Sequence, residues 1–182
     1  MHLAGRAFDA CFRDEPFGDP RVQQQFRYCV RLAALCHDSG HAPFSHAAEF
    51  AMPTLRALNI RCYDPSKVAH RIDKRVHHED YTIAILTQTS LADAIRENFS
   101  FTPEHVARLV SHEVAIEDDF FIHDGFDLRF LLSQLITSDL DADRLDYLVR
   151  DSYYTGARYG QTDVNWLVSN LARHVDEQGR VS

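Results

Sequence analysis

The chain has 182 residues, of which 45% are hydrophobic and 25% are charged, a composition typical of globular proteins and not of disordered ones. Acidic residues number 27 and basic residues 19, so the net charge is −8, and a binder of duplex nucleic acid is not expected. We also expect no signal peptide and no membrane span, because the longest apolar run, residues 32–36, is far shorter than the roughly 20 residues that a span needs.

Helical spacing of hydrophobic residues runs through most of the chain, and only seven Gly and six Pro interrupt it, so the sequence predicts an all-α fold. Helices are predicted over residues 1–13 and 21–37, separated by Gly18-Asp19-Pro20. A short helix that starts at residues 43–45 and ends before Pro53 follows, and then helices over 79–88 and 91–98. Thr102-Pro103-Glu104 is typical of a helix start, and that helix is predicted to run to about Val114.

The longest predicted helix covers residues 127–154, with Gly156 at the position of its C-cap. The C-terminal segment differs, because residues 175–181 have the pattern of two short strands around a glycine turn, which the chain end cuts off. We therefore expect helices through residues 1–174 and the start of a hairpin in residues 175–182.

Cysteine and histidine usage indicates a reducing compartment and a polar site. Cys11, Cys29, Cys36 and Cys62 show no CxxC spacing, so we expect buried thiols in the cytoplasm and neither a zinc knuckle nor disulfides. The chain contains 11 histidines, several of them clustered. That clustering is the first indication of a functional site.

The strongest candidate site is the run of residues 36–46, CHDSGHAPFSH, which ends an apolar helix with a His-Asp doublet and continues past a glycine with two more histidines. Imidazole nitrogen and carboxylate oxygen suit Mn, Fe, Zn or Mg centres. Adjacent side chains at a helix end can turn toward one point, because the chain leaves helical geometry there. A capping aspartate with surface histidines is the structural alternative, but three His and one Asp within ten residues favour the metal site.

A second candidate site is the run of residues 139–151, DLDADRLDYLVRD. Helical spacing puts Asp139, Asp143, Tyr147 and Asp151 on one stripe, where they would repel one another unless a cation or ligand satisfies them. The alternative is a solvated acidic face braced by residues 146 and 150, and we assign Asp141 and Asp146 to such a face.

Further histidines fall into two groups. His77-His78-Glu79 is weak by itself and becomes a plausible phosphate contact if a metal site exists elsewhere. His46 and Glu49, three residues apart in a helix, could form an acid–base dyad in which the carboxylate orients the imidazole, with a surface contact as the alternative. Six histidines have no partner pattern and are assigned structural roles: His2, His70, His105, His112, His123 and His174.

Residues 37–46 resemble the HD-domain signature in the form found in deoxynucleoside triphosphate triphosphohydrolases, the dGTPase-like group. Residues 141–151 resemble the second signature of that group, and the order and separation match, with His78-Glu79 between them. Neighbouring subfamilies differ at informative positions. Cyclic-dinucleotide phosphodiesterases usually carry Lys where His41 stands, and hydrolases of guanosine tetraphosphate carry Glu-Asp where this chain has Ala42 and Pro43.

The resemblance implies an all-α HD fold over residues 1–174 and one divalent metal ion, which is Mn, Fe, Mg or Zn. That ion is held by His37, Asp38, Asp143 and one further His. In such enzymes water attacks the α-phosphorus of a dNTP and gives a deoxynucleoside and inorganic triphosphate. The implied partner is therefore a nucleotide substrate.

The resemblance also assigns roles to matching positions. His46 is the acid–base group, and Glu49 orients it. Phosphate oxygens are held by His41, His78 and Arg144. The sugar faces Tyr147 and Asp151, where Asp151 can accept a hydrogen bond from the 3′-hydroxyl.

Two departures from the family pattern concern the ends of the chain. The family's fourth ligand is a His in an Arg-x-x-His-Ser-Leu-Gly stretch just upstream of the position of Met1. His2 cannot replace that ligand, because it lies six residues later, about 240° around a helix. Family members also continue past residue 182. We therefore expect a fragment, or a gene model that starts at an internal Met, and a homo-oligomer in the full-length form.

Two other functions stay open. A non-catalytic HD module that lacks one ligand would bind a nucleotide or a partner without turnover. A different HD phosphohydrolase would act on nucleoside monophosphates or other phosphoesters. Metal content discriminates the first alternative, and the phosphate product discriminates the second.

Overall fold

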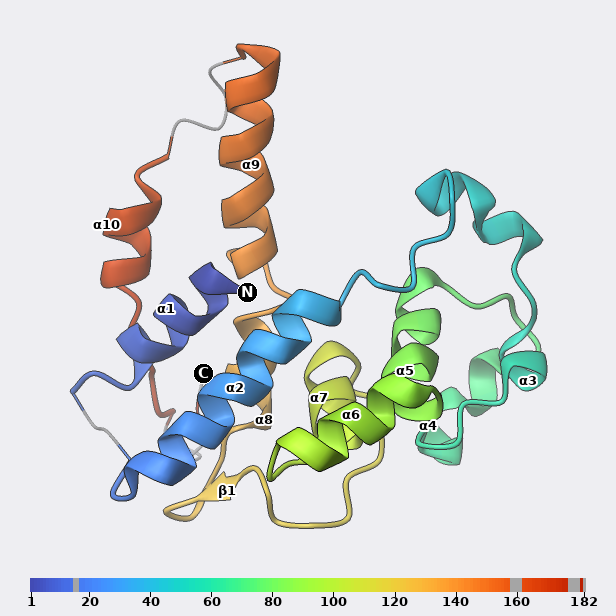
Figure 1. Ribbon diagram of the computed structural model, residues 1–182, viewed down its shortest axis with the longest axis horizontal. Helices are drawn as coiled ribbons and strands as arrows, with labels where there is room; N and C mark the ends of the chain where they lie inside the picture. Colours follow the sequence, from blue (N-terminus) through green and yellow to red (C-terminus); the bar gives the residue numbers. More distant parts are fainter. Residues whose placement is uncertain (15–16, 158–161, 177–180, 182) are drawn as a thin grey trace. The chain divides into compact units, whose positions relative to one another are not determined.

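The computed structural model describes residues 1–14, 17–157, 162–176 and 181. These residues are mostly helical, with one two-stranded sheet (Figure 1), so the predicted all-α class is confirmed. Nowhere in the described part of the chain is a helix both long and apolar enough to cross a bilayer. The chain divides into two compact units: unit 1 is Met1–Ala34 with Phe121–Ser182, and unit 2 is Leu35–Phe120.

The elements follow in chain order. Unit 1 begins with α1 (His2–Cys11) and α2 (Pro20–Cys36), whose last two residues belong to unit 2. Unit 2 continues with the 3-10 helix η1 (Ser45–Ala51), α3 (Leu55–Leu58), α4 (Pro65–Val68), the 3-10 turn η2 (Ala69–Arg71), α5 (His78–Gln88), α6 (Ser90–Asn98) and α7 (Pro103–Val110). Unit 1 resumes with β1 (Ile122–His123), β2 (Phe126–Asp127), α8 (Arg129–Gln134), α9 (Ala142–Thr155) and α10 (Val164–Ser169).

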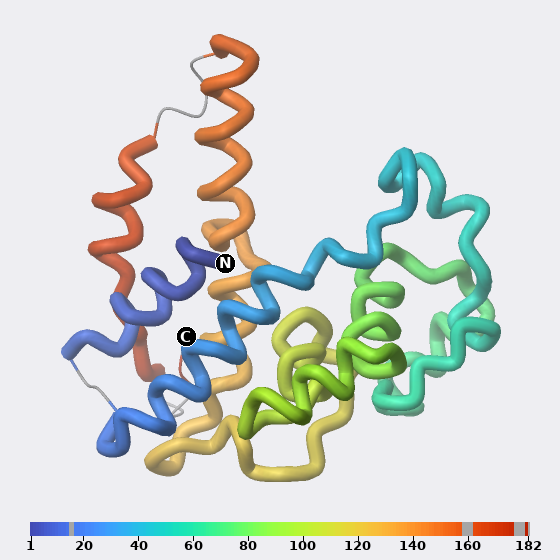
Figure 2. Tube along the Cα trace, viewed as in Figure 1, coloured from blue at the N-terminus to red at the C-terminus, as the bar shows by residue number. Residues whose placement is uncertain are grey.

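Unit 1 is built on α1, which packs against α9 and α10 (Figure 2). Four phenylalanines form its aromatic core. The ring centroids of Phe8 and Phe12 lie 4.7 Å apart, and Phe17 lies 4.8 Å from Phe12 and 5.3 Å from Phe26. All four rings are buried. Such aromatic pairs stabilise a core beyond the area that they bury.

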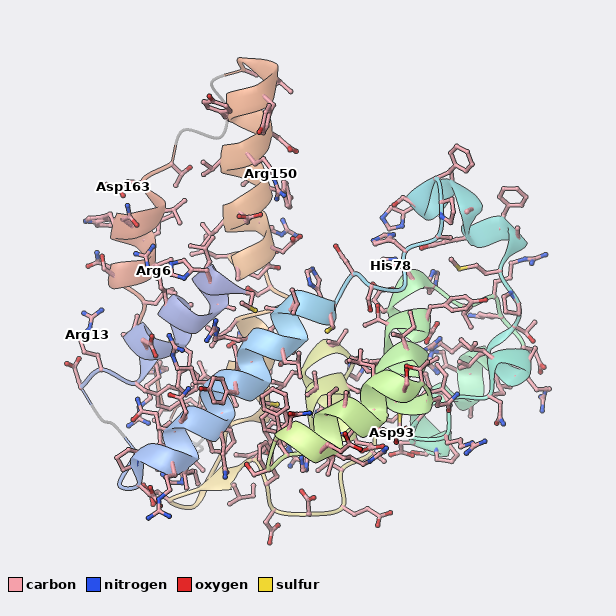
Figure 3. The ribbon with its side chains drawn as sticks, in the orientation of Figure 1. Arg6, Arg13, His78, Asp93, Arg150 and Asp163 are labelled. Atoms are coloured by element: carbon pink, nitrogen blue, oxygen red, sulfur yellow. The ribbon has the colours of Figure 1, made fainter. Side chains whose placement is uncertain are left out.

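Unit 2 is organised around α5, which packs against α6 and α7. Its core takes Ile83 and Leu86 from α5, Ile95 from α6, and Val106 and Leu109 from α7, all almost completely buried. Because α5 is held on these two sides, the position of its first turn is well defined. That first turn carries His78 (Figure 3).

Most helices lie at the residues where the hydrophobic spacing predicts them. The helix predicted at Thr102-Pro103-Glu104 begins there, with the Thr102 hydroxyl accepting a hydrogen bond from the His105 amide at 3.4 Å. It ends at Val110, four residues before the predicted end. The short helix predicted between residues 43 and 53 is the 3-10 helix η1.

The prediction of one helix over residues 127–154 is wrong, because α8 and α9 are separate helices with residues 135–141 between them. Asp141 causes this start of α9: its carboxylate accepts hydrogen bonds from the amides of Ser138 at 2.9 Å and Arg144 at 2.8 Å. Asp141 is only 6% exposed, so its assignment to a solvated face is also wrong. Asp139 precedes the helix and does not share a helical stripe with Asp143.

The hairpin of β1 and β2 was not predicted. Ile122 pairs with Asp127, and His123 pairs with Phe126. The two turn residues have positive φ, 50° at Asp124 and 82° at Gly125, which is the requirement of a tight two-residue hairpin turn. An Asp-Gly pair is a strong signal for such a turn, so the sequence contained the signal.

The remaining predictions concern the C-terminus and the cysteines. Val175 and Val181 form one antiparallel bridge, while residues 177–180 of the predicted hairpin lie outside the described residues. Cys11, Cys29 and Cys36 are buried free thiols as expected, and Cys62 is half-buried. Burial raises the pKa of Cys11 to about 11.

Candidate active site

The His-Asp doublet lies directly after the last residue of α2, as predicted. The chain turns there: the Ser39 amide donates to the Cys36 carbonyl at 2.9 Å, and the His41 amide donates to the Asp38 carbonyl at 3.1 Å. The His37 Nε2 and Asp38 Oδ2 atoms are 3.5 Å apart. Two ligands of one ion, each at about 2.0–2.2 Å from it, lie within about 4 Å of each other. The doublet therefore has the donor atoms and the spacing of a metal-binding pair.

Gly40 fixes this turn against the first turn of α5. A Cβ atom at Gly40 would overlap the His78 carbonyl oxygen and the Thr82 nitrogen, so only glycine permits the approach. The Gly40 amide donates to Thr82 Oγ1 at 3.0 Å, and the Thr82 hydroxyl donates to the His37 carbonyl at 2.7 Å. The doublet turn and α5 are thereby joined through one buried threonine.

A strained turn returns the chain to the doublet. Phe44 and Ser45 have φ values of 70° and 51°, which are uncommon for residues other than glycine. Ser45 Oγ lies 3.1 Å from His41 Nδ1. Non-glycine residues in the left-handed region concentrate at functional sites, and here they lead directly to His46.

The three predicted histidines of this site come together. The rings of His41 and His78 are stacked, with centroids 3.8 Å apart and planes 12° from parallel. The ring of His46 stands edge-on, at 5.2 Å from His41 and 5.0 Å from His78. One nitrogen from each ring lies within 4.8 Å of the others.

The Glu49 carboxylate organises the histidines. Its Oε1 atom lies 3.1 Å from Nδ1 of His46 and 3.1 Å from Nδ1 of His78. Its Oε2 atom lies 3.2 Å from Nδ1 of His77. The predicted contact of His46 with Glu49 is present, whereas His77 was not predicted to contact this carboxylate. His77 is exposed, and nothing in the sequence around it distinguishes it from an ordinary surface histidine.

Hydrogen bonds from His78, His77 and His46 lower the pKa of Glu49 to about 2, so this carboxylate is ionised at neutral pH. An ionised carboxylate only accepts hydrogen bonds. An imidazole that bonds to this carboxylate through Nδ1 therefore carries a proton on Nδ1, and its Nε2 atom points away from the carboxylate. This arrangement orients an imidazole for proton transfer at Nε2.

The stacked pair is poorly suited to hold one metal ion. The lone pair of an imidazole nitrogen lies in the ring plane, and the planes of His41 and His78 are nearly parallel with centroids 3.8 Å apart. The two lone pairs therefore cannot both point at one ion without a rotation of the rings. His37 and Asp38 fit a metal better than this stacked pair does.

The other predicted site residues lie on α9 in unit 1. Asp143 is in the first turn of that helix, and spacing of four residues places Asp143, Tyr147 and Asp151 along one side of it. The Arg144 side chain is half-exposed. The roles of these four residues toward a metal or a substrate stay predictions. Asp146 and Arg150 form the exposed ion pair that was predicted.

Among the histidines assigned structural roles, His105 fits that assignment well. It is 4% exposed, its Nδ1 accepts from the Thr102 amide at 3.0 Å, and its Nε2 lies 3.0 Å from both carboxylate oxygens of Asp118. These contacts secure the start of α7.

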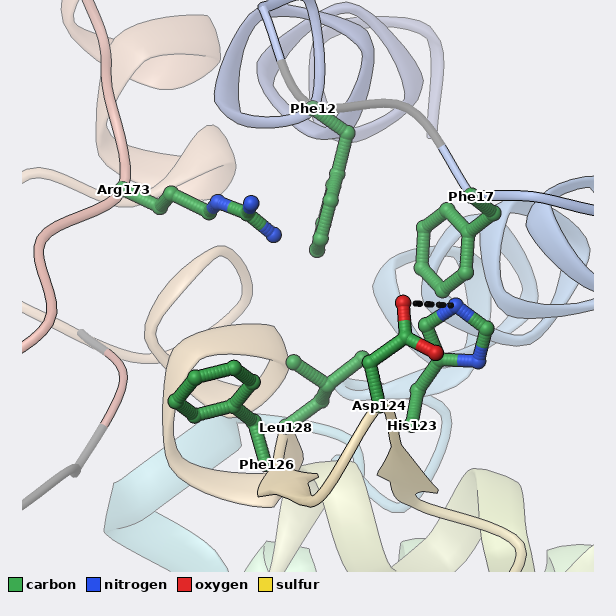
Figure 4. A pocket seen from close by; sticks show the side chains of 7 residues that line it. All are labelled: Phe12, Phe17, His123, Asp124, Phe126, Leu128 and Arg173. Carbon is green, nitrogen blue, oxygen red and sulfur yellow. Dashed lines mark ion pairs between the residues drawn. The ribbon is translucent and has the colours of Figure 1, made fainter.

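Unit 1 also contains a cavity of about 210 Å³, lined by no predicted site residue (Figure 4). The Arg173 guanidinium lies 5.5 Å from the ring centroid of Phe12. The His123 Nε2 atom is buried, 3.4 Å from Asp124 Oδ2. The wall is mostly aromatic: Phe12, Phe17, His123, Asp124, Phe126, Leu128 and Arg173 line it.

Comparison with known proteins identifies homologues of this chain. The chain is 30% identical to the uncharacterized protein YwfO of Bacillus subtilis over 176 residues, which cover 96% of this chain and 32% of that protein. It is 30% identical to the deoxynucleoside triphosphate triphosphohydrolase SAMHD1 homolog of Dictyostelium discoideum over 155 residues, which cover 85% of this chain and 26% of that protein. No family model matches the chain.

A solved structure shares the fold. The phosphohydrolase from Bacteroides thetaiotaomicron aligns with a TM-score of 0.60 and 24% identity, over 99% of this chain and 33% of that chain. The chain thus spans about a quarter to a third of the length of these proteins. The resemblance inferred from the two signatures is confirmed, because homologues of this chain include SAMHD1 triphosphohydrolases.

Proposed function

We propose that this homologue of the SAMHD1 proteins is a metal-dependent HD phosphohydrolase that converts a dNTP to a deoxynucleoside and inorganic triphosphate. The homologues support the broader class, an HD phosphohydrolase. The observation that carries the proposal is the Glu49 carboxylate, which is shared by His46 and His78. Two imidazoles that an ionised carboxylate holds in place are suited to proton transfer beside a phosphate.

The proposed metal site consists of His37, Asp38 and Asp143, with the one further His that the family resemblance implies. Imidazole and carboxylate donors of this kind suit Mn, Fe, Mg or Zn, and the 3.5 Å separation of the His37 and Asp38 donor atoms fits one ion. When bound, the ion would polarise a phosphate oxygen and offset negative charge.

The proposed reaction breaks the bond between the α-phosphorus and the 5′ oxygen of the deoxynucleoside. A water oxygen forms a bond to the phosphorus and gives up a proton, and the departing 5′ oxygen takes up a proton. His46 is the proposed acid–base group, because Glu49 holds its Nδ1 proton and leaves Nε2 to exchange a proton with the reacting groups.

His41, His78 and Arg144 are the proposed phosphate contacts. An imidazole whose Nδ1–H is bonded to Glu49 donates to a phosphate only when Nε2 is also protonated. Tyr147 and Asp151 are the proposed sugar contacts, where Asp151 accepts from the 3′-hydroxyl.

The experiment is a product assay with dGTP as the first substrate and each candidate ion added in turn. We expect deoxyguanosine and inorganic triphosphate in equal amounts, and His46→Gln should slow their formation by roughly 10²- to 10⁴-fold, the usual contribution of a general acid or base. His112→Gln is the matched control, because His112 is exposed and lies outside the proposed site.

The products separate the proposal from its alternatives. Orthophosphate release from a nucleoside monophosphate, without triphosphate release from dGTP, would indicate a different HD phosphohydrolase. Metal and nucleotide binding without any product would indicate a non-catalytic binding module.

A further inference from the structure

A buried cluster of charges lies in unit 2, and none of its members belongs to the proposed site. Arg71 donates to both oxygens of Asp80, with Nη1–Oδ2 at 3.0 Å and Nη2–Oδ1 at 2.8 Å. It also donates to Glu113, with Nε–Oε1 at 2.9 Å and a second contact from Nη2 to Oε2. The Tyr63 hydroxyl donates to Asp80 Oδ1 at 2.7 Å. The Asp80 side chain is 3% exposed.

Asp80 connects this cluster to the start of α5. Its Oδ2 atom accepts a hydrogen bond from the His77 amide at 2.9 Å, and His77 is the N-cap residue of α5 while His78 is its first residue. Burial alone would raise the pKa of Asp80, but hydrogen bonds from Arg71 and Tyr63 lower it, so the carboxylate is ionised. Four donors therefore hold one buried anion at the helix start.

The path of the chain into α5 determines whether the side chains of His77 and His78 point toward Glu49. His77 and His78 are adjacent in sequence, and they reach different oxygens of the same carboxylate. Both contacts require that the chain enter α5 along one path, because a rotation of the first turn would move the two imidazoles in different directions. The Asp80 bond to the His77 amide fixes that path from inside unit 2.

We propose that Arg71, Asp80, Glu113 and Tyr63 are positioning residues, which hold His77 and His78 toward Glu49 and thereby keep the proposed active site in its reacting geometry. The functional part of this inference rests on the proposed hydrolase activity. Buried ion pairs often add little net stability compared with apolar residues. Their role can instead be to specify one arrangement of the chain. Here the specified arrangement is the first turn of α5.

The same unit contains a matched control. Arg56 and Asp73 form an equally bidentate pair, with distances of 2.8 Å and 3.1 Å. Their side chains are 65% and 72% exposed, and neither residue contacts Glu49 or α5 in the described interactions. Asp73→Asn removes the same charge as Asp80→Asn but changes no contact at the start of α5.

The experiment compares Asp80→Asn, Asp73→Asn and the unmodified chain, each confirmed as folded by circular dichroism. Nitrogen-15 chemical shifts of labelled histidines, at one neutral pH, report which ring nitrogen carries the proton. We expect the Nδ1-protonated forms of His77 and His78 to become partly averaged in Asp80→Asn and to stay unchanged in Asp73→Asn. With dGTP, kcat should fall roughly 10- to 100-fold in Asp80→Asn, as for other residues that orient a site from behind, with a smaller change in KM.

A folded Asp80→Asn variant with unchanged His77 and His78 shifts would overturn the proposal. Should Asp80→Asn fail to fold, Tyr63→Phe decides: it removes one hydroxyl from the same carboxylate, and unchanged histidine shifts in that variant would also overturn the proposal. Shifted histidine signals in a chain without hydrolase activity would support the positioning cluster and contradict the proposed function alone.

Discussion

At the scale of single residues, Glu49 is the carboxylate that three imidazoles contact. It is the shared acceptor of His46, His77 and His78. None of the three histidines bonds to another through Nδ1, so the removal of one carboxylate disturbs all of them together. This makes Glu49 the residue whose substitution separates an organised acid–base site from a group of surface histidines.

Glu49→Gln should therefore impair hydrolysis without unfolding the chain. The amide offers one acceptor oxygen and no charge, so at most part of the Nδ1 protons keep a partner. We expect kcat for dGTP to fall roughly 10- to 100-fold, measured as triphosphate release. Glu97→Gln is the control, because Glu97 is an exposed glutamate of the same unit. Equal activity of the two variants would contradict the orienting role.

The pKa of Glu49 also predicts how stability depends on pH. That pKa is about 2 in the folded chain, whereas an unfolded chain has the ordinary value of about 4.3. The unfolded state therefore binds the proton first, so the stabilisation from Glu49 is fully present above about pH 5 and is lost as the pH falls toward 2.

The measurement is the free energy of unfolding by urea, for the unmodified chain and for Glu49→Gln, at several pH values below neutrality. The difference between the two chains should shrink steadily as the pH falls. A difference that stays constant down to the lowest pH would show that the carboxylate is not held in its ionised form.

At the scale of elements, hydrophobic spacing predicted the helices whose apolar faces are buried against neighbours. It failed between α8 and α9 because Leu135 and Ile136 are themselves buried, so the apolar pattern continues through a segment that is not helical. The signal for the break was Asp141, whose cap carboxylate was interpreted as a surface charge. A cap can be recognised with certainty only once its backbone partners are known.

The candidate site was predicted unevenly for a similar physical reason. His41, His46 and Glu49 lie within nine residues, and their contacts follow from local chain geometry. His77 and the cluster of Arg71 and Asp80 depend on which segments pack together in unit 2. Sequence spacing carries no information on that packing, so the contact of His77 with Glu49 and the role of the cluster could be found only in the structure.

Gly40→Ala tests the close approach of the doublet turn to α5. The added Cβ would overlap backbone atoms of His78 and Thr82, which cannot yield as a flexible side chain would. We expect unfolding by urea to show a loss of about 3 kcal/mol, in the upper range for overpacking. Gly18→Ala is the control, since nothing lies within 4 Å of its Cβ position. Similar stability of both variants would show that the close approach of the Gly40 turn to α5 does not stabilise the fold.

Asp141→Ala tests the cap of α9. It leaves the amides of Ser138 and Arg144 without their acceptor and should lower the unfolding free energy by about 1–2 kcal/mol. Asp146→Ala, which removes an exposed partner of Arg150 on the same helix, should change it by less than about 0.5 kcal/mol. The order of the two losses is the test, and a larger loss for Asp146→Ala would contradict the assigned cap.

At the scale of the whole molecule, the chain covers 32% of YwfO and 26% of the Dictyostelium discoideum protein. The proposed ligand set includes one His that the family pattern puts upstream of Met1. Three protein ligands can hold a catalytic ion, so some metal should bind to the 182 residues alone. Fusion of an Arg-x-x-His-Ser-Leu-Gly segment of the family pattern before Met1 should tighten metal binding and speed triphosphate release. A homo-oligomeric assembly also stays a prediction at this scale.

The central claim is that two signatures far apart in the sequence serve one metal-dependent site. The most direct measurement is the content of bound metal, by elemental mass spectrometry, in the 182-residue chain and in its Asp143→Ala and Asp151→Ala variants. We predict that Asp143→Ala loses the ion, because a proposed ligand is removed, while Asp151→Ala keeps the ion and binds dGTP more weakly. Retention of the ion in Asp143→Ala at the level of the unmodified chain would contradict the claim.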